Sequence, residues 1–215
     1  MADPTTADAT RADAPAPRIG SIDGRHAGTP LAAALPAAPA MRVNLRAGAD
    51  AVPALEAALG LSLSGAIGTS DTDRLRSALR LGPDEWLLIE EDAGGKTGGG
   101  AGKESGVDGG AGAFRAPLPT DLAGVGAIHS AVDVSHRNAA ILVTGPRAAE
   151  ALEHGCPRDL SLEAFPPGAC ARTLIGKCEV VLWRGKPDAF RIEVWRSFAP
   201  YAMDFLAEAC RDASL

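Results

Sequence analysis

The chain has 215 residues and a formal net charge of −6, and hydrophobic residues make up 46% of it. That length is enough for one large domain or two small ones with a real core, while the acidic balance disfavours a protein that binds nucleic-acid phosphates, which needs a basic face. Aromatic residues make up only 4% of the chain, beside 25 Gly and 16 Pro. Part of the chain is therefore not expected to belong to a core.

The sequence does not match the patterns of a transmembrane helix, a secretory signal or a zinc site, which predicts a cytoplasmic protein. Charges interrupt every apolar window of about 18 residues, which disfavours a transmembrane helix. Residues 1–10 are acidic rather than basic, so they do not resemble a secretory signal. The cysteines lack the Cys-x-x-Cys spacing of zinc or redox sites, which favours free thiols in a reducing compartment. They are Cys156, Cys170, Cys178 and Cys210.

The chain opens with a segment of low complexity. Residues 1–40 are rich in Ala, Pro, Asp and Thr and lack periodicity, which predicts a disordered N-terminal arm. Residues 41–46 then alternate between apolar and polar, as a half-buried strand does. A helix is expected next, with Asp50 as its cap, Pro53 in its first turn and Gly60 at its end.

The first half continues with two strands and a helix. Residues 74–81 place leucines on one face and arginines on the other, and residues 85–89 form a returning strand after the turn Gly82-Pro83-Asp84. Residues 93–113 are glycine-rich and indicate a flexible insertion rather than a phosphate-binding loop. A helix over about 120–128, weakened by two glycines, closes this half.

The rest of the chain repeats this plan. Its expected strands are 139–144, 169–175, 178–184 and 190–195. A helix opens at Gly145-Pro146 and ends at Gly155. The last helix is the clearest in the chain, with Ser197 as its cap, Pro200 in its first turn and an apolar stripe along one side.

These elements predict an α+β fold of two similar βαββα-type halves, each an antiparallel sheet covered by helices on one face. The first half spans 41–130, including the insertion, and the second spans 131–215. A duplicated module is favoured over two unrelated halves that share a plan.

The sequence offers no clear catalytic group. His129 and His136 flank Asp133 and Ser135, but on an extended strand Asp133 and Ser135 point to one side and His136 to the other. No Gly-x-Ser-x-Gly elbow, Walker loop or Gly-x-Gly-x-x-Gly turn is present. We therefore expect no catalytic, cofactor-binding or metal-binding residue in this chain.

Two tryptophans on the last predicted hairpin indicate a covered surface. Trp183 and Trp195 share its more polar face with Arg191, and Arg196 follows directly. Aromatic and arginine side chains together are typical of protein–protein interfaces. The same face could equally pack against the sheet of the other half, and both interpretations stay open.

Six short motifs, taken in order, resemble the gamma subunit of heterotetrameric sarcosine oxidase. They lie within residues 41–215 and are Leu81-Gly-Pro-Asp-Glu-Trp-Leu87, Val132-Asp-Val-Ser135 with Arg137, Gly145-Pro-Arg-Ala148, Gly155-Cys-Pro157, Phe165-Pro-Pro-Gly168 and Arg196-Ser-Phe-Ala199. The N-terminal arm and the glycine-rich insertion depart from the compact subunit typical of that family.

The resemblance implies a fold similar to the folate-binding module of the aminomethyltransferase T-protein. It also implies a complex that oxidatively demethylates sarcosine to glycine with H₂O₂ and, with tetrahydrofolate, forms 5,10-methylenetetrahydrofolate. FAD, FMN, NAD, the folate site and zinc would lie in other subunits, and none in this chain. The partners would be the alpha, beta and delta subunits, mainly alpha, with no nucleic acid and no membrane.

On this resemblance, the chain is expected to be a non-catalytic structural subunit. A second hypothesis is a stand-alone folate-dependent aminomethyl or formyl transferase, for which Asp133 and Glu193 are the candidate acidic residues. A third is an adaptor unrelated to one-carbon metabolism, in which Trp183 and Trp195 recruit another partner.

Overall fold

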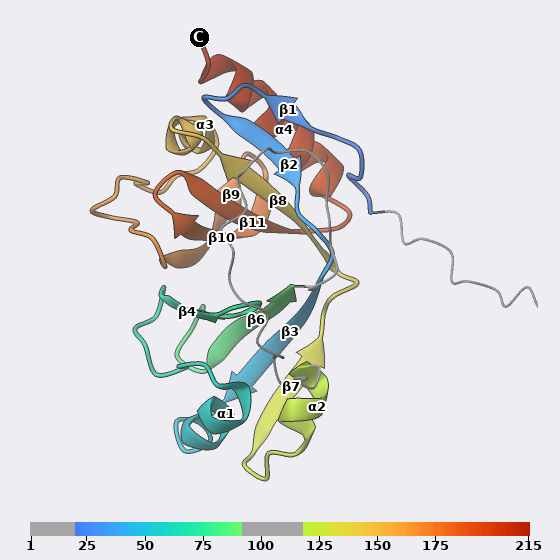
Figure 1. Cartoon of the computed structure of the whole chain (residues 1–215), viewed down its shortest axis with the longest axis vertical. Helices are drawn as coiled ribbons and strands as arrows, with labels where there is room; N and C mark the ends of the chain where they lie inside the picture. The colour runs from blue at the N-terminus through green and yellow to red at the C-terminus, as the bar shows by residue number, and fades with distance from the viewer. Residues whose placement is uncertain (1–19, 92–117) are drawn as a thin grey trace, which may run out of the picture.

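The computed structural model describes residues 20–91 and 118–215, which form two antiparallel β-sheets packed face to face (Figure 1). The first sheet has the order β4-β5-β6-β3-β7 and the second the order β1-β2-β8-β11-β10-β9. The strands of the first sheet are β3 (Ala40–Ala47), β4 (Ser70–Asp73), β5 (Arg76–Arg80), β6 (Glu85–Glu91) and β7 (His129–Asp133). Those of the second are β1 (Ala27–Gly28), β2 (Ala33–Pro36), β8 (Asn138–Thr144), β9 (Cys170–Ile175), β10 (Cys178–Lys186) and β11 (Ala189–Trp195).

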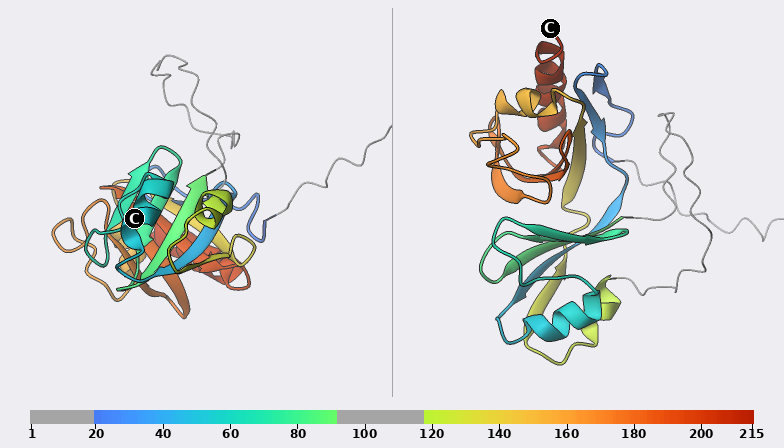
Figure 2. Two further views of the ribbon diagram at one scale, coloured as in Figure 1. Left: turned by 90° about the horizontal axis from the view of Figure 1, so that it is seen from below. Right: turned by 60° about the vertical axis from the view of Figure 1, so that its left-hand side comes forward.

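Helices cover the outer face of each sheet, so the layers run helices, sheet, sheet, helices (Figure 2). The helices α1 (Val52–Leu59) and α2 (Leu118–Ala123) share one buried apolar core with the outer face of the first sheet. The helices α3 (Ala148–Glu153) and α4 (Ala199–Asp212) do the same for the second sheet. The predicted α+β class, with antiparallel sheets covered by helices, is confirmed.

Local signals place the helix boundaries with two exceptions. Pro53 and Pro200 lie in the first turns of α1 and α4, and Gly60 ends α1 with a positive φ of 64°. The predicted caps Asp50 and Ser197 are wrong, because the cap positions fall one residue later and carry no side-chain hydrogen bond.

The two halves repeat each other more fully than predicted. The series β3-α1-β4-β5-β6-α2 matches β8-α3-β9-β10-β11-α4, and the corresponding strands take the same order in each sheet. The strand β4 was not predicted, and Arg74, with φ 52°, and Leu75 form the turn to β5 rather than belonging to a strand over 74–81.

Each repeat also places one strand in the sheet of the other. The strand β2 directly precedes β3 along the chain but pairs with β8, and β7 precedes β8 but pairs with β3. The chain thus crosses between the sheets at residues 37–39 and again at 134–137 (Figure 1). The repeats are joined by a reciprocal exchange of strands.

The exchange corrects two predicted boundaries. Residues 20–40 are not a disordered arm: Ile22, Ala32 and Ala34 are buried, and β2 adds to the second sheet. The boundary between 130 and 131 is wrong as well, because it cuts through β7. The composition of the first 40 residues concealed β2. Its alanines pair with β8 without needing bulky side chains, but alanine has a low propensity for strands and gives no strand signal in the sequence.

Two further predictions concern the region between the halves. The predicted helix over 120–128 is shorter, because α2 ends at Ala123 before Gly124. The predicted insertion 93–113 lies outside the described residues. Within the described part of the chain, no helix is long and apolar enough to cross a membrane.

Candidate functional site

The inner faces of the two sheets meet around a small apolar centre. Strand alternation turns every second side chain of β5, β6, β9 and β10 toward this space. The contact buries Leu79, Leu87, Ile89, Val134, Cys170 and Val181, with Trp183 partly buried against them. Polar and charged side chains surround this centre, and they form the candidate site.

At one end of the contact, the two sheets enclose a cleft of about 260 Å³. Glu85 of β6 lies in its wall and accepts a hydrogen bond from Arg172 of β9 at 2.9 Å and from Asn44 of β3 at 3.2 Å. Arg46 of β3 approaches the same carboxylate at 3.3 Å. The hydrogen bond from Arg172 is the main reason that the pKa of Glu85 lies below its usual value, despite burial.

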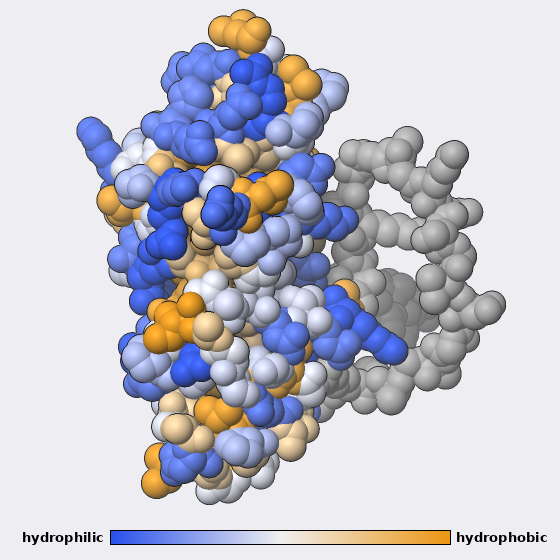
Figure 3. Space-filling model, turned by 90° about the vertical axis from the view of Figure 1, so that its left-hand side faces the viewer, coloured by the Kyte–Doolittle hydropathy of each residue, from blue (hydrophilic) through white to orange (hydrophobic). Residues whose placement is uncertain are grey.

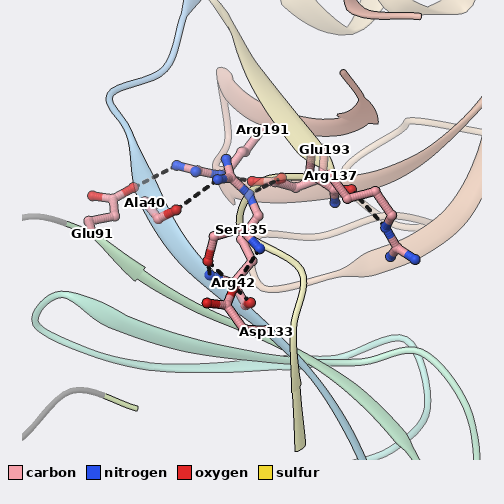
Figure 4. Close-up of polar contacts among 9 residues, drawn as sticks. Ala40, Arg42, Glu91, Asp133, Ser135, Arg137, Arg191 and Glu193 are labelled. Carbon is pink, nitrogen blue, oxygen red and sulfur yellow. Dashed lines mark hydrogen bonds and ion pairs between the residues drawn. The ribbon is translucent and has the colours of Figure 1, made fainter. Parts of the chain in front are cut away.

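Deeper between the sheets, four charged side chains form a chain of ion pairs (Figure 4). Glu193 of β11 accepts from Arg42 Nε of β3 at 2.5 Å and from Arg191 Nε at 2.8 Å. Arg191 Nη1 continues to Glu91 of β6 at 2.7 Å. The side chains of Arg42, Glu193 and Arg191 are 4%, 1% and 5% exposed. This chain joins both sheets in a region of low dielectric.

The ion-pair chain lies beside both crossings of the backbone. Arg42 Nη1 donates to the carbonyl of Ala40, at the start of β3, at 2.9 Å. The backbone N–H of Arg42 donates to the hydroxyl of Ser135, in the second crossing, at 2.8 Å. Arg42 therefore ties the two crossings to the ion pairs (Figure 4).

The acidic residues of the transferase hypothesis are engaged in structural contacts. Glu193 is almost wholly buried between two guanidinium groups. Asp133 caps the turn after β7 by accepting from the Ser135 backbone N–H at 2.8 Å, and hydrogen bonding from Ser135 holds its pKa below its usual value. A general acid at neutral pH needs a raised pKa instead. Neither residue is arranged for proton transfer.

The described residues also contain no cluster of three or more His, Cys, Asp or Glu side chains that could hold a metal ion. The four cysteines are buried and unpaired. Burial raises the pKa of Cys170 to about 12 and also raises the pKa values of Cys178 and Cys210. Thiols with raised pKa values are poor nucleophiles, which fits their interpretation as small core residues.

The structure separates the four residues predicted as an interface. Trp183 and Arg191 lie between the sheets of this chain, and Trp183 Nε1 donates to Ser70 Oγ of β4 at 2.9 Å. For these two residues, the structure shows the intramolecular contact that the sequence left open. Trp195 is 49% exposed and Arg196 is exposed, so their role in a subunit contact stays a prediction.

Sequence reasoning missed Arg42, Glu85 and Arg172. Each lies on the inner face of a strand, and the alternation of side chains along the strand was the one sequence signal that could have placed it there. Their spacing along the chain does not reveal the ion pairs, because each pairs with a residue on a strand that is distant in sequence.

Comparison with known proteins identifies relatives across most of the chain, although no family model matches it. The sarcosine oxidase subunit gamma of Corynebacterium sp. (strain U-96) is 29% identical over 177 residues, which cover 80% of this chain and 76% of the relative. The subunit of the same name from Arthrobacter sp. is 27% identical over 173 residues, covering 79% and 75%.

Solved structures agree with the sequence relatives. A chain of heterotetrameric sarcosine oxidase from Corynebacterium sp. U-96, in complex with pyrrole 2-carboxylate, superposes with a TM-score of 0.71 at 28% identity and 88% coverage of both chains. The glycine cleavage system aminomethyltransferase T from Bartonella henselae gives a TM-score of 0.52 at 13% identity, covering 83% of this chain and 48% of that one. The latter likeness concerns the fold alone. The resemblance inferred from the six motifs is confirmed: the homologues of this chain are gamma subunits of a heterotetrameric oxidoreductase.

Proposed function

We propose that this chain is the non-catalytic gamma subunit of a cytoplasmic heterotetrameric sarcosine oxidase. The observation that carries the proposal is the likeness to such subunits over most of the chain, in sequence at 29% identity and in fold at a TM-score of 0.71. The assembled enzyme oxidatively demethylates sarcosine to glycine with H₂O₂ and, with tetrahydrofolate, forms 5,10-methylenetetrahydrofolate.

The use of charge in the inter-sheet contact supports a structural role. Glu193 and Glu85 are neutralised by arginines from the opposite sheet. Side chains paired in this way hold the two repeats together, and they give no unpaired acid or base for chemistry. In the proposed complex, FAD, FMN, NAD, zinc and the folate site belong to the alpha, beta and delta subunits.

A surface around Trp195 is the proposed contact with the large alpha subunit. The guanidinium of Arg137 lies 5.7 Å from the centroid of the half-exposed Trp195 ring. Arg196 and the half-exposed Phe198 follow along the chain. Exposed aromatic side chains beside arginines are the groups that dominate the binding energy of many interfaces.

Co-expression with the other three subunits tests both parts of the proposal. The full chain is expected to elute with them as one complex in size-exclusion chromatography. The variant Trp195→Ser should lower the yield of the complex at least tenfold while the isolated chain keeps its melting temperature. Leu162→Ser is the matched control, because Leu162 is also an exposed apolar residue but lies elsewhere.

Two outcomes would contradict the proposal. A chain that stays monomeric beside the other three subunits refutes the function. Assembly that is equally unaffected by Trp195→Ser and Leu162→Ser refutes only the assignment of the surface.

A further inference from the structure

The strand β7 leaves one edge of the first sheet open. Among the described residues it pairs with β3 alone, and residues 130–133 are exposed. The backbone N–H of Val134 donates to the carbonyl of Arg42 at 2.9 Å. Val134 and Arg42 are therefore a hydrogen-bonded pair of this antiparallel ladder. Because hydrogen-bonded and non-hydrogen-bonded pairs alternate, the backbone N–H and C=O groups of Ala131 and Asp133 point away from β3. Among the described residues, these backbone groups have no hydrogen-bond partner.

This edge has few of the features that usually protect an exposed strand. Free edges commonly carry lysine, proline, bulges or inward-pointing charges. The strand β4, at the other edge of the same sheet, has two aspartates among its four residues, and the backbone N–H of its first residue, Ser70, donates to the carbonyl of Gly168, in the loop before β9. In β7 the only charge is at the last residue, and Val132 is 54% exposed. Ile128, directly before β7, is 90% exposed.

A small pocket lies beside the open edge. It measures about 200 Å³ and is enclosed by β3, β7 and α2. Its lining is Val43, Leu122, Ala123, His129, Ala131 and Asp133. A residue of an added strand that lies opposite Ala131 would point to the same side of the sheet. The small Ala131 leaves room for an aliphatic side chain from that position to enter the pocket.

The edge also continues into the surface around Trp195. The crossing that follows β7 ends at Arg137, which stacks on Trp195 and accepts a hydrogen bond from the Arg196 backbone N–H at 2.7 Å. Figure 1 shows β7 leading into this crossing and on to β8. By contrast, the face drawn in Figure 3 carries its apolar side chains as separate small patches among polar ones.

We propose that an extended segment of another subunit of the complex adds to the first sheet as a strand along β7, with an aliphatic side chain in the adjoining pocket. Unpaired backbone N–H and C=O groups along an edge are complementary to another strand and to little else. The inference rests on the proposed function, since it names where a partner of this chain binds.

A proline at position 131 tests the edge directly. The N–H of Ala131 points away from β3, so Ala131→Pro removes a donor from the open edge without removing a bond of the β3–β7 ladder. Thr72→Pro is the matched control, because the pairing of Asp73 with Arg76 places the Thr72 N–H on the outer edge of β4. Ala131→Lys is a second variant that keeps the backbone donor but puts a charge on the edge and fills the pocket.

The measurements are co-purification of the full chain with the other three subunits and amide hydrogen exchange of β7. Ala131→Pro and Ala131→Lys should each weaken assembly at least tenfold, and Thr72→Pro should not. In the wild-type complex, exchange at Ala131 and Asp133 should slow at least tenfold relative to the isolated chain. Melting of each isolated variant shows whether it is folded.

The outcomes separate this inference from the proposed function. If the wild-type chain does not assemble, both fall. If it assembles but both variants assemble equally well and exchange on β7 is unchanged, the edge is not the docking site and the proposed function stands. If the isolated chain dimerises with β7 protected, a second copy occupies the edge and the inference is overturned.

Discussion

Replacement of Glu193 by glutamine tests the interpretation of the buried ion pairs as the joint between the two repeats. Gln keeps the size of the side chain but removes its charge, so the guanidinium groups of Arg42 and Arg191 remain buried without the carboxylate that they share. Arg191 keeps Glu91, which is half exposed, and its Nη2 already has no hydrogen-bond partner among the described residues. Among the described residues, Arg42 keeps the hydrogen bond from its Nη1 to the backbone carbonyl of Ala40.

The expected loss is large for a single substitution. Removing one partner from a buried ion pair costs about 3–5 kcal/mol, because the remaining charge stays desolvated. A domain of this size loses about 2–4 °C of melting temperature per kcal/mol. Glu193→Gln should therefore lower the melting temperature of the isolated chain by about 6–20 °C.

Urea unfolding followed by tryptophan fluorescence measures the change in the free energy of unfolding. Glu179→Gln is the matched control, because Glu179 is 60% exposed and 3.7 Å from Arg172, and exposed pairs contribute about 0–1 kcal/mol. A Glu193→Gln variant within about 1 kcal/mol of the wild type would refute the reasoning, since it would mean that the buried arginines do not depend on this carboxylate.

Three further predictions use other parts of the structure. Gly145→Ala should destabilise the chain by about 1–3 kcal/mol, because Gly145 has φ +119° and a Cβ there would lie 2.4 Å from a backbone carbonyl oxygen. Gly185→Ala is the control, since a Cβ at Gly185 would meet nothing within 4 Å, and it should leave the free energy of unfolding in the same urea titration nearly unchanged. Glu85 has a pKa below its usual 4.5 in the folded chain, so its contribution to stability is complete above pH 4.5 and is lost as the pH falls through the lowered value. The melting temperature of Glu85→Gln should therefore fall less steeply with decreasing pH than that of the wild type. An equally steep fall would contradict this prediction. Removal of residues 1–36 should cost at least about 3 kcal/mol more than removal of residues 1–19, since only the longer deletion takes away β1 and β2; equal stabilities would show that these strands add nothing.

Local sequence patterns predicted the elements whose signals lie within a few residues of each other. The apolar stripe and Pro200 identified α4, and the alternation of Trp183 and Trp195 with apolar neighbours identified the hairpin of β10 and β11. The motif order identified the relatives. These signals depend on short-range periodicity, on turn residues or on short motifs, and none of them requires knowledge of the partner strand.

Long-range contacts were the features that local patterns could not give. The strand β2 contains two alanines and a proline among its four residues, so its local propensity for a strand is low, and it is held by pairing with β8. Strand alternation placed Glu193 and Arg191 on one face of β11. It could not show that Arg42 and Glu91 of the other sheet pair with them. The predicted half-boundary failed for the same reason, since β7 is assigned to its sheet only by its pairing with β3.

The exchange of strands gives the ion pairs more weight than a contact between two separate domains would have. The repeats cannot part without breaking the β2–β8 and β3–β7 pairings, and both crossings lie beside Arg42. A defect at Glu193 should therefore weaken both sheets together, and the chain should unfold in one transition rather than repeat by repeat. The paired charges between the sheets therefore hold the outer edges of both sheets in fixed positions relative to each other.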